Sequence, residues 1–106
     1  MSARLVRVRL RPKTLAALEA IAAERWTSVA SECVEALARH LRAARPVRVG
    51  RVPMPEGVDV VVPLEADLWH EAKRVADGAD VTIGQLCRLA AQAHARARPR
   101  LRRIAS

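Results

Sequence analysis

The stretch Arg4-Leu5-Val6-Arg7-Val8-Arg9-Leu10-Arg11 alternates apolar and basic residues along most of its length. An alternation with a period of two predicts a β-strand with one buried face, because successive side chains point to opposite faces of a strand. Val6, Val8 and Leu10 would then face a core. The outward face would carry Leu5 and the guanidinium groups of Arg7, Arg9 and Arg11.

A similar stretch, Val58-Asp59-Val60-Val61-Val62-Pro63-Leu64, occurs 54 residues later. Its outward positions are Asp59, Val61 and Pro63. Identities at this spacing continue through the helical stretches that follow each strand: Val6, Val8, Leu10, Ala22, Cys33, Ala36, His40, Arg42 and Ala43 recur as Val60, Val62, Leu64, Ala76, Cys87, Ala90, His94, Arg96 and Ala97. The chain is therefore an internal duplication.

Each copy continues with two predicted helices. In the first copy, apolar spacing predicts a helix over roughly 12–25, and Thr27-Ser28 caps a second helix that ends near Ala44. In the second copy we expect helices over about 65–76 and 82–98. Thr82-Ile83-Gly84-Gln85 reads as a capping box, and Pro99 is expected to end the last helix.

One strand with two helices is too small to bury its own apolar face, so the two copies must pack together. The two strands most simply pair with each other as an antiparallel ribbon that the four helices cover on one face. The predicted fold is mainly α with this short two-stranded ribbon, in the order β-α-α-β-α-α. Its parts are a first repeat (1–44), a basic extended linker (45–57), a second repeat (58–98) and a basic tail (99–106), with the two repeats forming one globular domain.

Composition favours a polyanionic partner. The 106 residues are 51% hydrophobic and 28% charged, a globular balance, and carry a formal net charge of +8. Residues 1–45 hold nine Lys/Arg against four Asp/Glu, whereas residues 58–98 hold five against six. The first repeat, the linker and the tail therefore carry the positive excess.

No membrane segment or signal peptide is recognisable, so we expect a cytoplasmic protein that does not enter a membrane. Cys33 and Cys87 occupy equivalent positions inside predicted helices and are interpreted as small core residues in a reducing compartment, with a disulfide as the less favoured alternative.

The alternating arginines are the strongest functional signal. A two-stranded ribbon fits the major groove of DNA, and arginine binds guanine O6 and N7 with two hydrogen bonds. The alternative is a solvated edge strand that charge protects from aggregation.

These features resemble the ribbon-helix-helix family, the Arc and MetJ type of DNA-binding protein. The resemblance rests on Val6-Arg7-Val8-Arg9-Leu10, the helix at Pro12 and Ser28-Val29-Ala30-Ser31-Glu32. The second copy matches through Val60-Val61-Val62-Pro63-Leu64, Leu68 and Val81-Thr82-Ile83-Gly84-Gln85-Leu86. Together the copies cover nearly all of the chain outside the linker and the tail. Each motif is short and degenerate, and its occurrence twice in register makes the resemblance more specific.

The resemblance implies that outward strand residues read bases and that the amino end of each repeat's second helix holds a phosphate. The base-reading set is then Arg7, Arg9 and Arg11 with Asp59, Val61 and Pro63. The phosphate-binding set is Ser28, Val29, Thr82 and Ile83, a role that exposed helix N–H groups also support. The basic residues of the linker and the tail are expected to add phosphate contacts: Arg48, Arg51, Arg100, Arg102 and Arg103.

The chain departs from the family in one respect, since family members usually dimerise from separate chains with identical strands. Here the strands differ, and two interpretations stay open. The pair reads an asymmetric site, with Val61 against a thymine methyl and Asp59 accepting from cytosine N4. Alternatively the second strand is a structural partner, in which Asp59 neutralises Arg7 or Arg9 across the ribbon.

The cysteine, histidine and tryptophan residues are interpreted as structural or surface residues rather than as site residues. Cys33 with His40 and Cys87 with His94 are too far apart along one helix to share a zinc ion. The two histidines are expected to be partly exposed near helix ends, His70 to lie on the surface, and Trp26 and Trp69 to anchor the core. The sequence contains no catalytic motif, so we expect no enzyme activity, no cofactor and no metal.

The sequence thus predicts a sequence-specific double-stranded DNA-binding protein, monomeric in solution because one chain supplies both halves of a pseudo-dimer, with further copies able to assemble on adjacent DNA sites. Repression, autoregulation and an accessory role at a plasmid transfer origin all suit it, since tandem chains of this type resemble relaxosome accessory proteins. The alternative is an antitoxin or assembly adaptor whose DNA binding is secondary.

Overall fold

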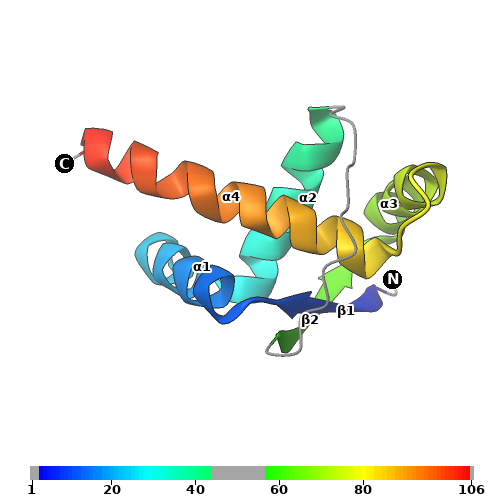
Figure 1. Cartoon of the computed structure of the whole chain (residues 1–106), viewed down its shortest axis with the longest axis horizontal. Coiled ribbons are helices and arrows are strands. Elements are labelled where there is room, and N and C mark those ends of the chain that lie inside the picture. The colour runs from blue at the N-terminus through cyan, green and yellow to red at the C-terminus, as the bar shows by residue number, and fades with distance from the viewer. Residues whose placement is uncertain (1–2, 44–56, 106) are drawn as a thin grey trace.

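The computed structural model describes residues 3–43 and 57–105, with side chains as far as residue 97. Six elements follow one another in the order β-α-α-β-α-α (Figure 1): β1 (Arg4–Leu10), α1 (Pro12–Arg25), α2 (Val29–Arg42), β2 (Val58–Leu64), α3 (Ala66–Gly78) and α4 (Ile83–Ala105). The fold is therefore mainly helical, as predicted. Residues 44–56, which make up nearly all of the expected linker, lie outside the described residues.

β1 and β2 form a two-stranded antiparallel sheet, which confirms the expected ribbon. Arg7 lies opposite Val61, Leu5 opposite Pro63 and Arg9 opposite Asp59. Positions 7 and 61 are also equivalent at the 54-residue spacing, so the register is symmetric about this central pair. The two strands have the same sequence of exposed and buried positions although their outward residues differ.

The helices repeat with the same spacing. α1 and α3 begin at positions 12 and 66, and α2 and α4 begin at positions 29 and 83. Even the backbone of the intervening turns repeats, since Trp26 (φ 58°) and Asp80 (φ 57°) both adopt the left-handed conformation. The duplication in the sequence is therefore a duplication in the chain's local structure.

The core lies between the inward face of the ribbon and the helices. Val8, Leu10, Val62 and Leu64 are fully buried there. They pack in one cluster with residues from all four helices, mostly leucine, alanine and cysteine. α4 approaches the ribbon so closely at Gly84 that a Cβ atom on this residue would lie only 2.9 Å from the backbone oxygen of Arg7.

The prediction that Trp26 anchors the core is wrong, since this side chain is 95% exposed. Trp26 is the C-cap residue of α1 and its left-handed backbone ends the helix, with the next residue donating its N–H to the Ala22 carbonyl. In this conformation the side chain points to solvent. Trp69, by contrast, is half-buried against the core as expected, with the Arg4 guanidinium 4.1 Å above its ring.

Helix ends differ from the predictions at two places. α3 extends to Gly78, two residues beyond the expected end. α4 continues through Pro99 to Ala105, so the prediction that Pro99 ends the helix is wrong, and the expected tail is largely helical. Proline removes one backbone hydrogen bond, but its fixed φ is helical and the arginines and leucine beyond it are strong helix formers.

Within residues 3–43 and 57–105, no helix is both long and apolar enough to cross a bilayer.

Candidate nucleic-acid interface

The outward face of the ribbon carries six side chains in three cross-strand pairs, Leu5–Pro63, Arg7–Val61 and Arg9–Asp59, and all six are exposed. Leu5 is 72% exposed and Val61 51% exposed. Because the inward residues are fixed in the core, the outward side chains stand on a rigid platform. The face thus has an apolar end at Leu5 and a charged end at Arg9.

The charged end contains an ion pair. Arg9 Nη1 donates to Asp59 Oδ1 across the ribbon at 3.2 Å, and both side chains are about half exposed. This places Asp59 beside Arg9, one of the two positions expected from the sequence. The contact holds the Arg9 guanidinium at the ribbon surface and offsets part of its charge.

Arg7 has a different environment. It lies opposite Val61 at the centre of the ribbon and takes part in none of the ion pairs found among the described residues. Its guanidinium is therefore the ribbon charge that is most available to an external acceptor.

Arg11 is exposed but lies beyond the end of β1, where it lines an open pocket of about 290 Å³ together with Lys13 and Arg96. The structure thus brings Arg7 and Arg9 together on the ribbon and leaves Arg11 beside the start of α1.

The amino ends of α2 and α4 are capped as predicted. Ser28 Oγ accepts a hydrogen bond from the Ser31 N–H at 3.1 Å. Thr82 Oγ1 accepts from the Gln85 N–H at 3.1 Å, and Gln85 Oε1 accepts from the Thr82 N–H at 2.8 Å, which is a complete capping box. Both hydroxyl groups are therefore committed to the helix ends.

The neighbouring Val29 and Ile83 are half-buried and pack against the core. A phosphate contact at these residues would accordingly use backbone N–H groups rather than their side chains.

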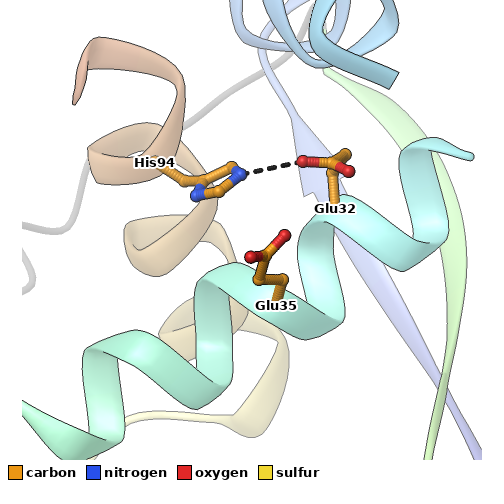
Figure 2. A group of neighbouring side chains, drawn as sticks. All are labelled: Glu32, Glu35 and His94. Carbon is orange, nitrogen blue, oxygen red and sulfur yellow. Dashed lines mark hydrogen bonds and ion pairs between the residues drawn. The ribbon is translucent and has the colours of Figure 1, made fainter. Parts of the chain in front are cut away.

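A buried polar cluster joins α2 to α4 (Figure 2), and sequence reasoning missed it. Glu32 is 1% exposed, and its Oε1 lies 3.0 Å from Nε2 of His94, which is 5% exposed. Thr27 donates its hydroxyl hydrogen to Oε2 of the same carboxylate. Arg25 contacts both Glu32 and Glu35. The expectation that His94 is partly exposed is therefore wrong, because α2 covers this residue and Glu32 forms a hydrogen bond with its Nε2 atom.

The pKa of the Glu32 carboxyl is lowered in this cluster. Burial by itself would raise the pKa, but the hydrogen bonds from Thr27 and His94 and the charge of Arg25 outweigh it. Because an ionised carboxylate can only accept hydrogen bonds, His94 donates from Nε2.

Only the first-repeat members of the cluster lack polar counterparts. At the 54-residue spacing they correspond to apolar residues in the second repeat: Arg25 to Ala79, Thr27 to Val81, Glu32 to Leu86 and Glu35 to Leu89. His94 lies in the second repeat itself, and its counterpart is His40. The sequence did contain a signal for the burial of Glu32, because this residue lies on the same apolar helical stripe as Val29 and Ala36.

The ligand atoms of Glu32, Glu35 and His94 lie within 4.8 Å of one another, close enough for one divalent cation. Arg25 already contacts both carboxylates, so the arrangement is that of a partly buried ion-pair network.

The two cysteines lie in the core as predicted. Burial raises the pKa of the Cys33 thiol to about 11 and that of Cys87 to about 12, so both are neutral thiols near pH 7. Neutral thiols are poor nucleophiles and poor metal ligands.

The side chains of the other predicted phosphate contacts lie outside the described residues. Arg48 and Arg51 lie outside the described residues. The backbone of Arg100, Arg102 and Arg103 belongs to α4, but their side chains also lie outside that part of the chain.

Comparison of the chain with protein-family models, curated proteins and solved structures gives no significant match.

Proposed function

We propose that this protein binds double-stranded DNA at specific sequences, with the β1–β2 ribbon in the major groove, as a tandem ribbon-helix-helix protein. The observation that carries the proposal is the outward ribbon face, where Arg7 and Arg9 stand exposed on a rigid two-stranded platform. A two-stranded β-ribbon fits into the major groove, and arginine is the side chain that most often reads guanine there.

The repeated element order supports the tandem interpretation. Both strand-helix-helix units have the same spacing, and the strand register is symmetric about Arg7 and Val61. One chain therefore offers the two halves that a dimer of identical chains would supply. We infer that the functional unit is a single chain.

The two strands would read different bases, because their outward residues differ. Arg7 suits a guanine, while Leu5, Val61 and Pro63 offer apolar contact to thymine methyl groups. Asp59 is engaged by Arg9 in the free protein, so its role is to position that guanidinium rather than to accept from cytosine. The preferred DNA site would accordingly lack two-fold symmetry.

Backbone contacts would come from the amino ends of α2 and α4 and from the basic residues of the linker and the last helix. Such binding would serve repression, autoregulation or assembly of a nucleoprotein complex at a plasmid transfer origin.

Two measurements test the proposal. Fluorescence anisotropy with random duplex DNA at about 50 and 200 mM salt should show binding that weakens steeply as salt rises. Selection from a pool of randomised duplexes should then enrich one asymmetric motif. Absence of binding near physiological salt would contradict the proposal and favour an antitoxin or assembly adaptor. A palindromic motif would contradict the asymmetric reading alone.

A further inference from the structure

The molecule carries opposite charges at two equivalent positions of its repeats. The first is the open pocket of about 290 Å³ at the start of α1, here called the basic pocket, whose charged residues are Arg11, Lys13 and Arg96. Its remaining lining residues are Thr14, Ala17, Gln92 and Ala95, so no carboxylate lies in it.

The second position is the start of α3. At the 54-residue spacing, Arg11, Lys13 and Ala17 of the basic pocket correspond to Glu65, Asp67 and Glu71, here called the acidic patch. All three acidic side chains are exposed, and none takes part in the ion pairs found within residues 3–43 and 57–97.

Neighbouring cations reduce the charge of the acidic patch without cancelling it. Arg42 occupies the position equivalent to Arg96, and Arg74 and Lys73 lie on α3 itself. Lys73 is paired with Asp77 at 3.0 Å. The patch still carries three carboxylates, at the N-cap and in the first two turns of α3.

We propose that copies of this protein associate head to tail, with the acidic patch of one copy seated on the basic pocket of the next. α1 and α3 lie on opposite sides of the molecule (Figure 1), so each copy offers one surface of each sign in different directions. A contact between unlike surfaces of this kind leaves a free surface at each end and continues into an open row.

A second copy fits the basic pocket better than a DNA phosphate does. The pocket and the patch occupy equivalent places relative to the ribbon, so a duplex lying along the ribbon would pass both in the same way. It would be attracted at Lys13 and repelled at Asp67. The same pair of charges is complementary between two copies.

The strength of the contact determines the protein concentration at which copies associate. Exposed ion pairs are individually weak, and free copies at micromolar concentration should remain separate. Copies bound at neighbouring DNA sites experience effective concentrations in the millimolar range. In that setting the inference rests on the proposed DNA binding, but the contact itself is tested without DNA.

Sedimentation of the DNA-free protein at low salt, up to about 1 mM, measures the contact directly. The wild-type average mass should rise with concentration. Lys13→Glu and Asp67→Lys should each abolish the rise, because each places like charges in the contact. The double variant, which restores opposite charges with the sides exchanged, should recover it. Glu19→Lys, on the exposed face of α1 outside the pocket, should behave as the wild type.

This design separates a specific contact from an effect of total charge. Lys13→Glu lowers the net charge and Asp67→Lys raises it, so a response to total charge would move the two single variants in opposite directions. Such a result would overturn the inference, as would a constant wild-type mass up to the highest concentration.

A DNA arm distinguishes this inference from the proposed function. If Lys13→Glu weakens binding to a single-site duplex while self-association is unchanged, the basic pocket binds phosphate and the head-to-tail contact is wrong. If binding to a two-site duplex is cooperative in the wild type and in the double variant but not in the single variants, the contact operates on DNA.

Discussion

Glu32 occupies a core position that holds leucine in the second repeat, and its charge depends on three partners. Replacing a buried, hydrogen-bonded carboxylate leaves those partners unsatisfied. Glu32 therefore makes the α2–α4 packing sensitive to pH, whereas Leu86 contributes only apolar contact.

We predict that Glu32→Gln lowers the free energy of unfolding at pH 7 by about 1–3 kcal/mol, because Arg25 and His94 lose a charged partner. The folded-state pKa of Glu32 lies below the ordinary value of 4.5, so its contribution is present above that pH and is lost as pH falls through the folded pKa. Urea unfolding at several pH values should thus show a smaller acid-induced loss in the variant. Glu19→Gln, an exposed change on α1, is the control, and equal acid sensitivity of wild type and Glu32→Gln would refute the prediction.

Trp26 is the second residue whose effect on stability depends on local structure. We predict that Trp26→Asn keeps or slightly raises stability, by up to about 1 kcal/mol, because asparagine tolerates the left-handed backbone better and an exposed ring gives up no core contact. Thermal unfolding measures the change. A loss of about 3–5 kcal/mol, as for a core tryptophan, would show that Trp26 is buried in solution.

The two ribbon arginines should respond differently to substitution. We predict that Arg7→Ala weakens binding to the selected DNA site by about 1–3 kcal/mol and binding to random duplexes less. Asp59→Asn should raise affinity for random DNA, because Arg9 loses the carboxylate that offsets its charge. Anisotropy on both DNAs measures this, with Arg39→Ala, at the end of α2 far from the ribbon (Figure 1), as control. Equal losses on both DNAs for Arg7→Ala would show a role as general charge only.

At the level of single residues, the sequence predicted those whose environment follows from strand or helix period. Alternation placed Arg7 and Arg9 outward and Val8 and Leu10 inward, as the structure has them. Trp26 and His94 were misplaced because their exposure depends on a turn conformation and on a partner from the other repeat. Glu32 could have been recognised as a charge on an apolar stripe, but not its partner, since Glu32 and His94 are 62 residues apart in the chain.

At the level of elements, helix starts were predicted better than helix ends. Ser28 and Thr82 identify the starts because each cap is a local interaction with the next turn. The end of α3 and the continuation of α4 past Pro99 depend on several small conformational preferences that compete with one another. The sequence pattern therefore predicted both helix ends too early.

We predict that Ser28→Ala and Thr82→Ala each reduce stability by about 0.5–2 kcal/mol, because each removes the side-chain oxygen that accepts a hydrogen bond from the first turn of its helix. Under the proposed function, both changes should also weaken DNA binding by misaligning the N–H groups at the helix start. Chemical denaturation and anisotropy on the folded fraction measure the two effects. Unchanged affinity together with lowered stability would remove the phosphate role from these helix ends.

At the level of the whole molecule, the difference between the two duplicated strands favours their pairing within one chain. Because Arg7 and Val61 are equivalent positions that face each other, an alternative pairing of equal strands from two chains would keep the same register. It would place Arg7 opposite Arg7 of the second chain, where like charges across a ribbon repel, and would remove Asp59 from Arg9. The observed pairing within one chain avoids the repulsion and keeps the Arg9–Asp59 bond.

We therefore predict that the free protein is a monomer of 11.6 kDa at micromolar concentration and physiological salt, with both ribbon strands from the same chain. The helices support this pairing, because Glu32 of the first repeat meets His94 of the second only when the two repeats pack on each other. Light scattering gives the mass, and cysteine crosslinks between ribbon positions identify the paired strands. A stable dimer mass at micromolar concentration, with crosslinks joining position 7 of two chains, would overturn the single-chain arrangement. Association that begins only near millimolar concentration would not, because the head-to-tail contact leaves each ribbon intact.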